Sequence, residues 1–435
     1  ATPVTLWAYG AMPLNNGNVG TIYYTANYLA GEDLVNPVTA APYTDEELEA
    51  FIEELPLHAP AMSRIMEMEC WAEAVVTGEN GFTIVPSDAN EQVSTLVSPD
   101  IATCPACREE LFDPENRRWH YPFINCTNCG PRFTIIEALP YDRPRTSMKD
   151  FTMCDPCRHE YEHPENRRFH AQPDACFDCG PHLSWYELGG QIAWGTTREE
   201  SDAILARAVA LLHEGKILAV KGLGGFHLVC DAQNEATLAE LRRRKRREGK
   251  AFAVMVADVD AARVWAQVSD EEAALLQSPA RPIVLLRKRA DVAYPAGLAD
   301  RLPELGVMLP TTPLQHLLVR DFGGMLVMTS GNLHDEPIQT DDAQAFGALA
   351  DVADAFIGND RAILSRYDDS VVRLIRIDGG ITAVQAIRRA RGYAPQALEI
   401  ANPSGLQVFA TGPEQKNTFT LLRGEQAFVS QHIGD

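Results

Sequence analysis

The chain has 435 residues, of which 46% are hydrophobic, and its formal net charge is −22. A chain of this length is too long for one hydrophobic core and suits about three domains. No apolar run reaches the roughly 18 residues that cross a bilayer, so we expect no membrane span. The absence of a secretory signal segment and the use of cysteine indicate a cytoplasmic protein with reduced thiols.

The first 93 residues indicate a small, acidic α+β module. Residues 3–9 and 82–85 read as strands, and residues 44–55 read as a helix that begins at a capping box of Thr44 and Glu47. Arg64 is the only basic residue among the first 100, so this segment holds most of the negative charge. Such a surface repels nucleic acid and other phosphate polymers.

Residues 94–188 contain two copies of one cysteine cassette, 50 residues apart. Each copy has two CxxC pairs, the sequence PENRR followed by an aromatic residue and a histidine, and a final Cys-Gly-Pro. This self-similarity indicates a duplicated structural unit. The two sets of cysteines are Cys104, Cys107, Cys126 and Cys129, and Cys154, Cys157, Cys176 and Cys179.

Four thiolates from two CxxC turns make the tetrahedral site that zinc prefers, and a site filled entirely by protein is structural. The cassettes therefore predict two structural zinc sites. Disulfides would need an oxidising compartment, whereas iron in the same site stays an alternative. The repeated pairs Arg117–Arg118 and Arg167–Arg168 either offset the negative charge of these sites or are exposed on polar turns. We assign His120 and His170 to packing near the metal rather than to ligation.

From residue 189 the pattern changes to helices that alternate with apolar strands, which predicts an α/β sheet to about residue 400. The glycine-rich turn at 222–225 does not match the spacing of a dinucleotide-binding motif or a P-loop. Any nucleotide would therefore be held by other groups. The predicted elements are helices over 201–214 and 235–247 and strands over 217–221, 252–256, 283–286 and 325–329.

Polar residues gather at the ends of these elements. Lys221 ends the first strand, a basic cluster follows the second helix, and Ser330 and Asn332 follow the last strand. Cations suit a polyphosphate, and short polar side chains can orient a small planar acid. The sequence thus predicts a site for a nucleotide and a small acid. The basic cluster consists of Lys245, Arg247 and Lys250.

Seven long segments carry a resemblance to a known family: YPFINCTNCGPRFTIIEALPYDRP, RRFHAQPDACFDCGP, KGLGGFHLVCDA, LGVMLPTTPLQHLL, TSGNLHDEPI, RYDDSVVR and IRRARGYAP. With them, residues 95–435 closely resemble the HypF-type hydrogenase maturation carbamoyltransferases. The resemblance implies a multidomain protein of the α+β and α/β classes. Its parts are a ferredoxin-like acylphosphatase-type module (1–93), duplicated four-cysteine zinc fingers in tandem (94–188), a YrdC-like α/β domain with a twisted sheet (189–400), and the start of an actin-like transferase domain (401–435).

The resemblance also implies a chemistry for the YrdC-like domain, with ATP, Mg²⁺ and carbamate or carbamoyl phosphate as reactants. A carboxylate oxygen attacks the α-phosphorus and yields carbamoyl adenylate, whose carbamoyl group then passes to the C-terminal cysteine of a HypE-type partner protein. That group is dehydrated to the cyanide ligand of a nickel–iron hydrogenase. The implied catalytic residues are Lys245, Arg247, Ser330 and Asn332, and the implied nucleotide-binding residues are Lys221, His227, Arg244, Lys250, Thr311, Arg366 and Arg388.

Several positions depart from the family pattern. Ala251 stands where proline is usual after Lys250, and Asn359 stands where histidine is common. The family's acylphosphatase module holds phosphate with an arginine in a VQGVGFR loop, whereas residues 11–20 read AMPLNNGNVG. We therefore expect an acylphosphatase-like fold with impaired or absent hydrolysis. Because residues 401–435 match only the opening strands of the transferase domain, we expect this chain not to complete the transfer.

Two other interpretations stay open. Zinc ribbons and YrdC-like folds both occur with RNA, and the basic run Arg242–Lys250 could bind a phosphate backbone, although the net charge of −22 opposes this. The chain could also be an inactive scaffold whose zinc sites brace a docking surface for a maturation partner. Exchange of pyrophosphate into ATP that depends on carbamate or carbamoyl phosphate separates the enzyme from the scaffold.

Overall fold

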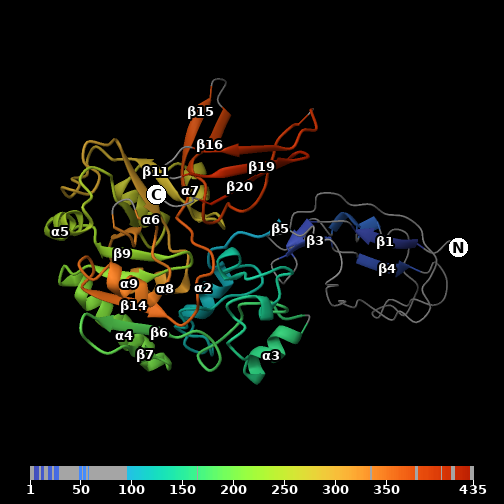
Figure 1. Cartoon of the computed structure of the whole chain (residues 1–435), viewed down its shortest axis with the longest axis horizontal. Helices are drawn as coiled ribbons and strands as arrows, with labels where there is room; N and C mark the ends of the chain where they lie inside the picture. The colour runs from blue at the N-terminus through green and yellow to red at the C-terminus, as the bar shows by residue number, and fades with distance from the viewer. Residues whose placement is uncertain are drawn as a thin grey trace. The chain divides into compact units, whose positions relative to one another are not determined.

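The computed structural model divides the chain into two compact units, Ala1–Ser98 with Ala138–Asp142, and Pro99–Glu137 with Arg143–Asp435 (Figure 1). Each unit is described by itself below. The structure describes residues 4–8, 11–13, 18–21, 24–28, 49–50, 52–54, 57, 96–163, 165–333, 336–377, 381–402, 404–412 and 417–431.

The described part of the first unit consists mainly of short antiparallel strands. The strand predicted at 3–9 is present as β1 (Val4–Ala8), which pairs with β4 (Tyr24–Tyr28). Of the predicted helix at 44–55, residues 49–50 and 52–54 are helical. The rest of that helix and the strand predicted at 82–85 lie outside the described residues, so the acylphosphatase-type module stays a prediction. A second group of strands consists of β2 (Ala11–Pro13), β3 (Asn18–Thr21) and β5 (Leu96–Val97).

The second unit is built on one mixed sheet of eleven strands, in the order β16-β15-β11-β12-β10-β13-β9-β8-β14-β6-β7. The pairs β10–β12, β11–β15 and β8–β14 are parallel and the other pairs are antiparallel. All four strands predicted between residues 217 and 329 are present, as β8, β10, β11 and β13. The bounds are β6 Leu183–Glu187, β7 Ala193–Gly195, β8 Leu218–Lys221, β9 Phe226–Asp231, β10 Ala253–Met255, β11 Ile283–Arg287, β12 Glu304–Met308, β13 Leu326–Ser330, β14 Ala355–Asn359, β15 Val371–Ile377 and β16 Ile381–Arg388.

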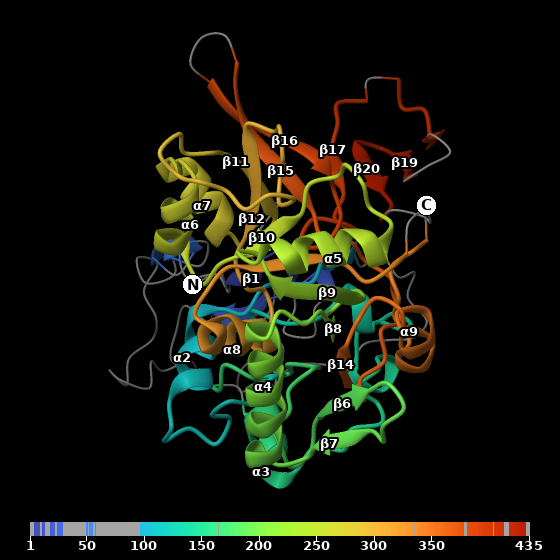
Figure 2. The same cartoon turned by 90° about the vertical axis from the view of Figure 1, so that its left-hand side faces the viewer.

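Helices cover this sheet, and their ends follow local sequence signals. The two predicted helices are α4, which begins at a capping box of Thr197 and Glu200, and α5, whose C-cap Arg246 is in the left-handed conformation with φ of 53°. Helix α4 packs against α8 and β7, and α5 packs against β9 (Figure 2). The bounds are α4 Arg198–His213, α5 Glu235–Lys245, α6 Val259–Trp265, α7 Asp270–Gln277, α8 Pro313–Phe322 and α9 Asp342–Ala348.

The hydrophobic core lies between the sheet and these helices. Phe226 and Leu228 of β9 are fully buried and belong to one cluster with Leu238 and Leu241 of α5. Burial of large apolar side chains on both surfaces fixes α5 on the sheet, and with it the basic residues at its C-terminal end. Within the part of the chain that the structure describes, every helix is too short or too polar to span a bilayer.

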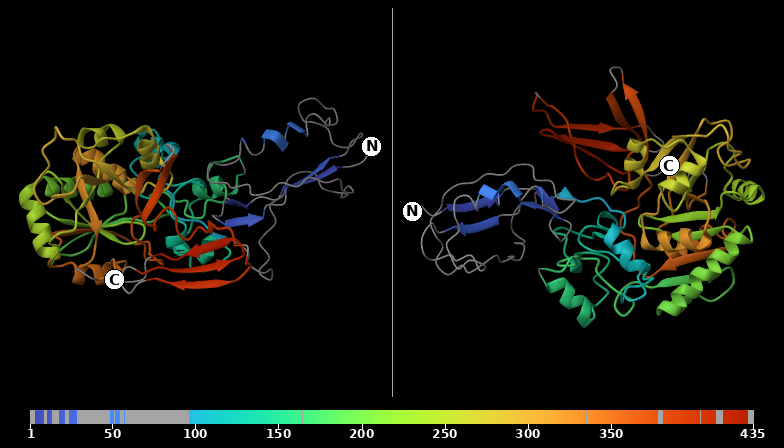
Figure 3. Two further views of the ribbon diagram at one scale, coloured as in Figure 1. Left: turned by 90° about the horizontal axis from the view of Figure 1, so that it is seen from above. Right: turned by 180° about the vertical axis from the view of Figure 1, so that it is seen from behind.

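The cysteine-rich region has little regular structure. Its helices α2 (Pro105–Phe112) and α3 (Asp155–Glu162) each begin directly after a cysteine of a CxxC pair, with a proline in the first turn, and two short 3₁₀ turns lie at Phe133–Ile135 and Arg143–Arg145. The region then runs directly into the large sheet, because β6 starts at Leu183. A separate four-stranded sheet contains the last strands of the chain, whose red ribbons are visible in Figure 3. These are β17 Leu398–Glu399, β18 Val408–Thr411, β19 Phe419–Arg423 and β20 Gln426–Val429.

Candidate functional site

Each set of four cysteines brings its sulfur atoms to the spacing of a tetrahedral metal site. The Sγ–Sγ distances are 3.5–3.8 Å in the first set and 3.6–3.9 Å in the second. Four sulfurs at about 2.3 Å from a central zinc ion would be about 3.8 Å apart. The two predicted four-cysteine sites are therefore confirmed, and their geometry fits structural zinc.

The repeated arginines donate to the sulfur atoms of the opposite cassette. Arg117 and Arg118 of the first cassette lie 3.3 and 3.4 Å from the Sγ of Cys157, and both Nη atoms of Arg167 lie 3.3 Å from the Sγ of Cys107. A four-thiolate zinc site carries two negative charges, and N–H donors to its sulfurs offset that charge. The prediction that the arginine pairs compensate the thiolates agrees with this geometry. Arg118 and Arg168 are buried, whereas Arg117 is exposed although it reaches the sulfur atom.

Three carboxylates hold these arginines in place. Glu160 of α3 pairs with Arg117 and Arg118 at 2.5 Å, and Glu110 of α2 pairs in the same way with the second arginine pair. Asp174 is fully buried and lies 2.9 Å from Arg118. The two metal sites thus share one network of charges.

The repeated histidines take no part in either set of sulfur atoms. His120 Nδ1 lies 2.8 Å from Asp202, and the ring of His170 packs against Tyr161 with centroids 5.0 Å apart. Their assignment to packing agrees with these contacts.

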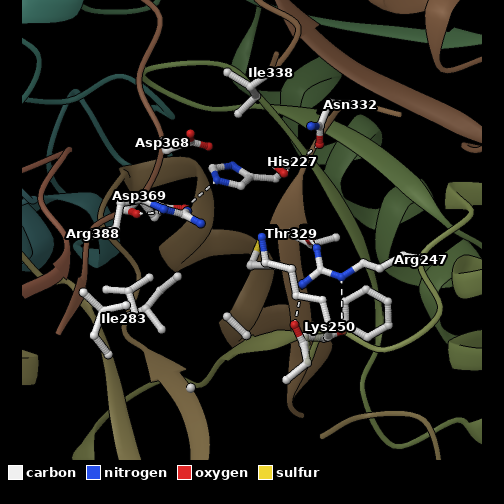
Figure 4. A pocket seen from close by; sticks show the side chains of 18 of the residues that line it. His227, Arg247, Lys250, Ile283, Thr329, Asn332, Ile338, Asp368, Asp369 and Arg388 are labelled. Carbon is white, nitrogen blue, oxygen red and sulfur yellow. Dashed lines mark hydrogen bonds and ion pairs between the residues drawn. The ribbon is translucent and has the colours of Figure 1, made fainter. Parts of the chain in front are cut away.

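A cavity of about 430 Å³ opens at the end of β13, beside β9 and β10 (Figure 4). Seven of the eleven predicted site residues line it, and they come from segments far apart in the sequence. These are His227, Arg247, Lys250, Ser330, Asn332, Arg366 and Arg388. The antiparallel pairing of β9 with β13 places His227 opposite Ser330. The cavity is thus rich in cations and short polar groups, as the sequence predicts.

Lys245 lies beneath the cavity rather than in its wall. Its side chain is buried, and its Nζ donates to the backbone oxygens of Ser330 and Asn332 at 2.5 and 2.7 Å and to Asn332 Oδ1 at 2.7 Å. Asn332 Nδ2 donates in turn to the Glu336 oxygen at 2.5 Å. Lys245 therefore fixes the Ser-Gly-Asn loop from behind.

Arg247 reaches the cavity because α5 ends at Lys245, two residues before it. Its Nε donates to the Lys250 oxygen at 3.1 Å, Nη1 donates to Thr329 Oγ1 at 3.0 Å, and the guanidinium lies over the Phe252 ring at 4.9 Å. Burial and the positive charges of Arg242 and Arg388 lower the pKa of Arg247 to about 10. Arg247 stays charged at neutral pH, and an anionic ligand in the cavity would stabilise that charge.

A buried carboxylate ties two walls of the cavity together. Asp369 lies 2.8 Å from His227 Nε2 and 2.7 Å from Arg391 Nε. Burial alone would raise the pKa of Asp369, but Arg391 and His227 outweigh it and hold that pKa well below its usual range. The ionised carboxylate fixes the His227 ring at the edge of the cavity (Figure 4).

Three predicted site residues lie elsewhere. Lys221 pairs with Asp342 and donates to the Asn359 oxygen at 2.8 Å, and Thr311 donates to Gln315 at 2.8 Å. Both line a second, smaller cavity of about 30 Å³. Arg244 pairs with Glu240 and Asp354 on the surface of α5.

The structure also adds residues that the sequence did not single out. Thr329, Asp368 and Asp369 line the cavity, and Arg391 supports it from behind through its contact with Asp369. Asp368 and Asp369 lie in the segment RYDDSVVR, and Arg391 lies in IRRARGYAP. Both segments contributed to the family resemblance. Their charged residues could therefore have been proposed as part of the site from the sequence.

Family profiles match most of the second unit. The HypF finger matches residues 103–136 and 153–186, the Sua5/YciO/YrdC family, described as telomere recombination, matches residues 210–390, and the HypF Kae1-like domain matches residues 403–435. The duplicated cassettes therefore correspond to two copies of one known finger.

Individual relatives agree with these profiles. The carbamoyltransferase HypF2 of Cupriavidus necator is 51% identical over 400 residues, which cover 88% of this chain and 48% of the relative. A crystal structure of full-length HypF in the phosphate- and nucleotide-bound form has a TM-score of 0.80 at 46% identity and covers 90% of this chain and 50% of that one. A threonylcarbamoyl-AMP synthase of Chromohalobacter salexigens is 32% identical over 37% of this chain and 89% of its own length. The chain spans about half the length of the HypF proteins it matches.

Proposed function

This chain belongs to the HypF family of carbamoyltransferases, and from that premise we propose that its cavity makes carbamoyl adenylate from carbamate and ATP. The observation that carries the proposal is the cavity itself, in which four cations from distant segments face a polar strand end. These cations are Arg247, Lys250, Arg366 and Arg388.

The reaction requires little covalent chemistry from the protein. A carbamate oxygen forms a bond to the α-phosphorus, the bond from that phosphorus to the bridging oxygen breaks, and its electron pair leaves with pyrophosphate. Such a displacement depends on alignment and on cations that neutralise the negative charge of the leaving group. Lys250, Arg366 and Arg388 can supply that charge, and Arg247 and the Ser-Gly-Asn loop lie where a small acid can be oriented.

Two relatives support this chemistry by name. The HypF crystal structure contains phosphate and nucleotide, and the synthase from Chromohalobacter is named for threonylcarbamoyl-AMP, an anhydride of AMP with a substituted carbamate. Carbamate decomposes in water, so a cavity walled by Ile283, Phe252 and Met328 would protect it.

Magnesium fits the cavity through one carboxylate. Asp368 lines the wall close to the cations, and Mg²⁺ is typically bound by one or two carboxylates together with substrate phosphates (Figure 4). When bound, Mg²⁺ would neutralise charge on the phosphates. We also propose that carbamate derives from carbamoyl phosphate and that the carbamoyl group passes to the C-terminal cysteine of a HypE-type partner, on the way to a cyanide ligand of a nickel–iron hydrogenase.

The alternative of RNA binding is not favoured, because the basic run is used within the fold. Arg242 donates to the oxygens of Gly297 and Arg247, and Arg243 and Arg244 pair with Glu240. These contacts account for most of the arginines in Arg242–Lys250 without a phosphate backbone.

Exchange of labelled pyrophosphate into ATP tests the proposed reaction against an inactive scaffold. We expect exchange that depends on ammonium carbamate and Mg²⁺ and that falls at least tenfold in Arg247→Ala, because a charge-assisted contact to the anion is lost. Arg243→Ala is the matched control, since this arginine is exposed and pairs only with Glu240 among the described residues. Absence of carbamate-dependent exchange in the unchanged protein would contradict the proposal.

A further inference from the structure

We infer that Ser330 acts in the cavity as a hydrogen-bond acceptor and selects an acid that carries an N–H group next to its carboxylate. Lys245 is the positioning residue that imposes this role from outside the cavity. The inference rests on the proposed function, because the ligand is taken to be the small acid that attacks ATP. The evidence for it is the set of hydrogen bonds around the Ser-Gly-Asn loop, in which each donor and each acceptor can be assigned.

The side-chain amide of Asn332 has only one possible orientation. The atom 2.7 Å from Lys245 Nζ must be the oxygen, since an ammonium group has donors and no acceptor. The atom 2.5 Å from the Glu336 backbone oxygen must be the nitrogen, since a carbonyl only accepts. Both contacts require the same orientation, so the oxygen and nitrogen of the Asn332 amide cannot be interchanged.

This orientation determines the direction of the Ser330 hydroxyl. Ser330 Oγ lies 2.7 Å from Asn332 Oδ1, an atom that only accepts. Ser330 must therefore donate its single proton to Asn332. What Ser330 can offer to a ligand in the cavity is its remaining lone pairs.

The neighbouring groups decide which part of the acid Ser330 meets. Arg247 uses three of its five N–H groups on the oxygens of Lys250, Thr329 and Ala251, and the remaining two suit a carboxylate. Arg247 and Ser330 line the same cavity. With its carboxylate on Arg247, the acid would direct its substituent toward Ser330. An amino substituent donates to the hydroxyl oxygen, whereas a methyl group leaves that oxygen unpaired.

Lys245 maintains this selectivity without touching the acid. All three of its N–H groups are directed to the loop, at 2.5–2.7 Å. Without the ammonium group, Asn332 Oδ1 loses the contact that fixes it, and the amide can turn. Ser330 could then present its proton to the cavity instead of its lone pairs.

The test compares two acids of nearly the same shape in the pyrophosphate exchange assay on the full chain. Ammonium carbamate offers an amino group and sodium acetate offers a methyl group, and potassium bicarbonate controls for bicarbonate formed from carbamate. We expect the unchanged protein to prefer carbamate and Ser330→Ala to reduce that preference about tenfold, through a higher KM for carbamate. The KM for ATP should stay the same. Ser330→Thr keeps the hydroxyl and should restore the preference.

Lys245→Met should reduce the preference for carbamate in the same way, while Arg243→Ala, an exposed cation of the same helix, should not. An unchanged ratio of carbamate to acetate in Ser330→Ala would overturn the inference while leaving the proposed function in place. A change confined to the Mg²⁺ concentration for half-maximal exchange would also overturn it, because Ser330 would then bind the metal. No exchange with either acid in the unchanged protein would overturn both.

Discussion

Arg118 of the first cysteine cassette donates a hydrogen bond of 3.4 Å to the Sγ of Cys157 in the second. Arg167 of the second cassette makes the reciprocal contacts to Cys107 of the first at 3.3 Å. Each four-cysteine site therefore depends on donors that the other cassette supplies. The duplication has produced one network with two metal positions rather than two independent fingers.

Replacing the arginines of the first cassette should weaken zinc binding in the second. In Arg117→Ala/Arg118→Ala, Cys157 loses two N–H donors, Glu160 loses both arginines, and the buried Asp174 keeps Arg168 at 3.4 Å but loses Arg118. Loss of such supporting contacts typically reduces metal affinity about 10- to 100-fold. Zinc transfer to a chromogenic chelator measures the effect, and we expect one of the two zinc ions to be released faster.

Arg158→Ala is the control for this experiment. Arg158 lies on α3 next to Cys157, but its side chain is exposed. Its removal should leave both release rates unchanged. If the double variant also behaves like the unchanged protein, the arginines are not part of the metal sites.

His316 should make the stability of the protein sensitive to mild acid. Burial and the neighbouring Arg281 and Arg108 lower the pKa of His316 to about 3, from a usual value of 6.5. Its neutral form is favoured in the folded state, so stability is full above about pH 6.5 and falls as the pH drops below it. Between pH 7.5 and 5.5 this amounts to about 1 kcal/mol.

Urea denaturation across this range measures that loss. His316→Gln should remove it, so that the free energy of unfolding changes less with pH than in the unchanged protein. His213→Gln, which alters an exposed histidine of α4, is the matched control. Equal pH slopes for His316→Gln and the unchanged protein would contradict the prediction.

Gly331 should not tolerate a side chain. A Cβ atom at this position would lie 2.7 Å from both the Cβ and the backbone oxygen of Phe226, a fully buried residue. Gly331→Ala should therefore displace the Ser-Gly-Asn loop, lower stability by about 1–3 kcal/mol and abolish pyrophosphate exchange. Gly347→Ala in α9 is the control, because a Cβ there meets no atom within 4 Å. Thermal unfolding and exchange rates distinguish the two, and normal exchange in Gly331→Ala would refute the argument.

Asp369→Asn should destabilise the chain at neutral pH. The substitution leaves the buried Arg391 without its charged partner, which typically costs about 3 kcal/mol. Because the pKa of Asp369 is depressed, its contribution is full above about pH 4 and is lost as the pH falls further. Denaturation should show a constant difference from the unchanged protein between about pH 6 and 8. Asp291→Asn, at an exposed pair with Arg289, should show almost no difference.

The metal sites were the part of the structure that the sequence determined most directly. The CxxC spacing predicted both sulfur sets, because the ligands of each set lie close together along the chain. The polar end of β13 could also be predicted from the sequence, because an apolar run leads directly into Ser330 and Asn332. Features that depend on residues close together in the sequence can therefore be predicted before the fold is known.

The partners of distant residues could not be predicted in the same way. Lys245 and Lys221 both read as ligands for phosphate, yet one supports a loop and the other pairs with Asp342. Which strands become neighbours decides this, and the order β13-β9-β8-β14 is not visible in the local pattern. The same limit hid Arg391, whose role depends on its contact with Asp369 across 22 residues.

Only a short connection joins the cysteine-rich region to the large sheet. Cys179 belongs to the second sulfur set, and Leu183 already pairs with Asn359 of β14. Any rearrangement of the sulfur atoms would pull on β6, and through it on the hairpin partner β7 at the border of the sheet. Occupancy of the second sulfur set would thus bear on how well that border of the sheet is ordered.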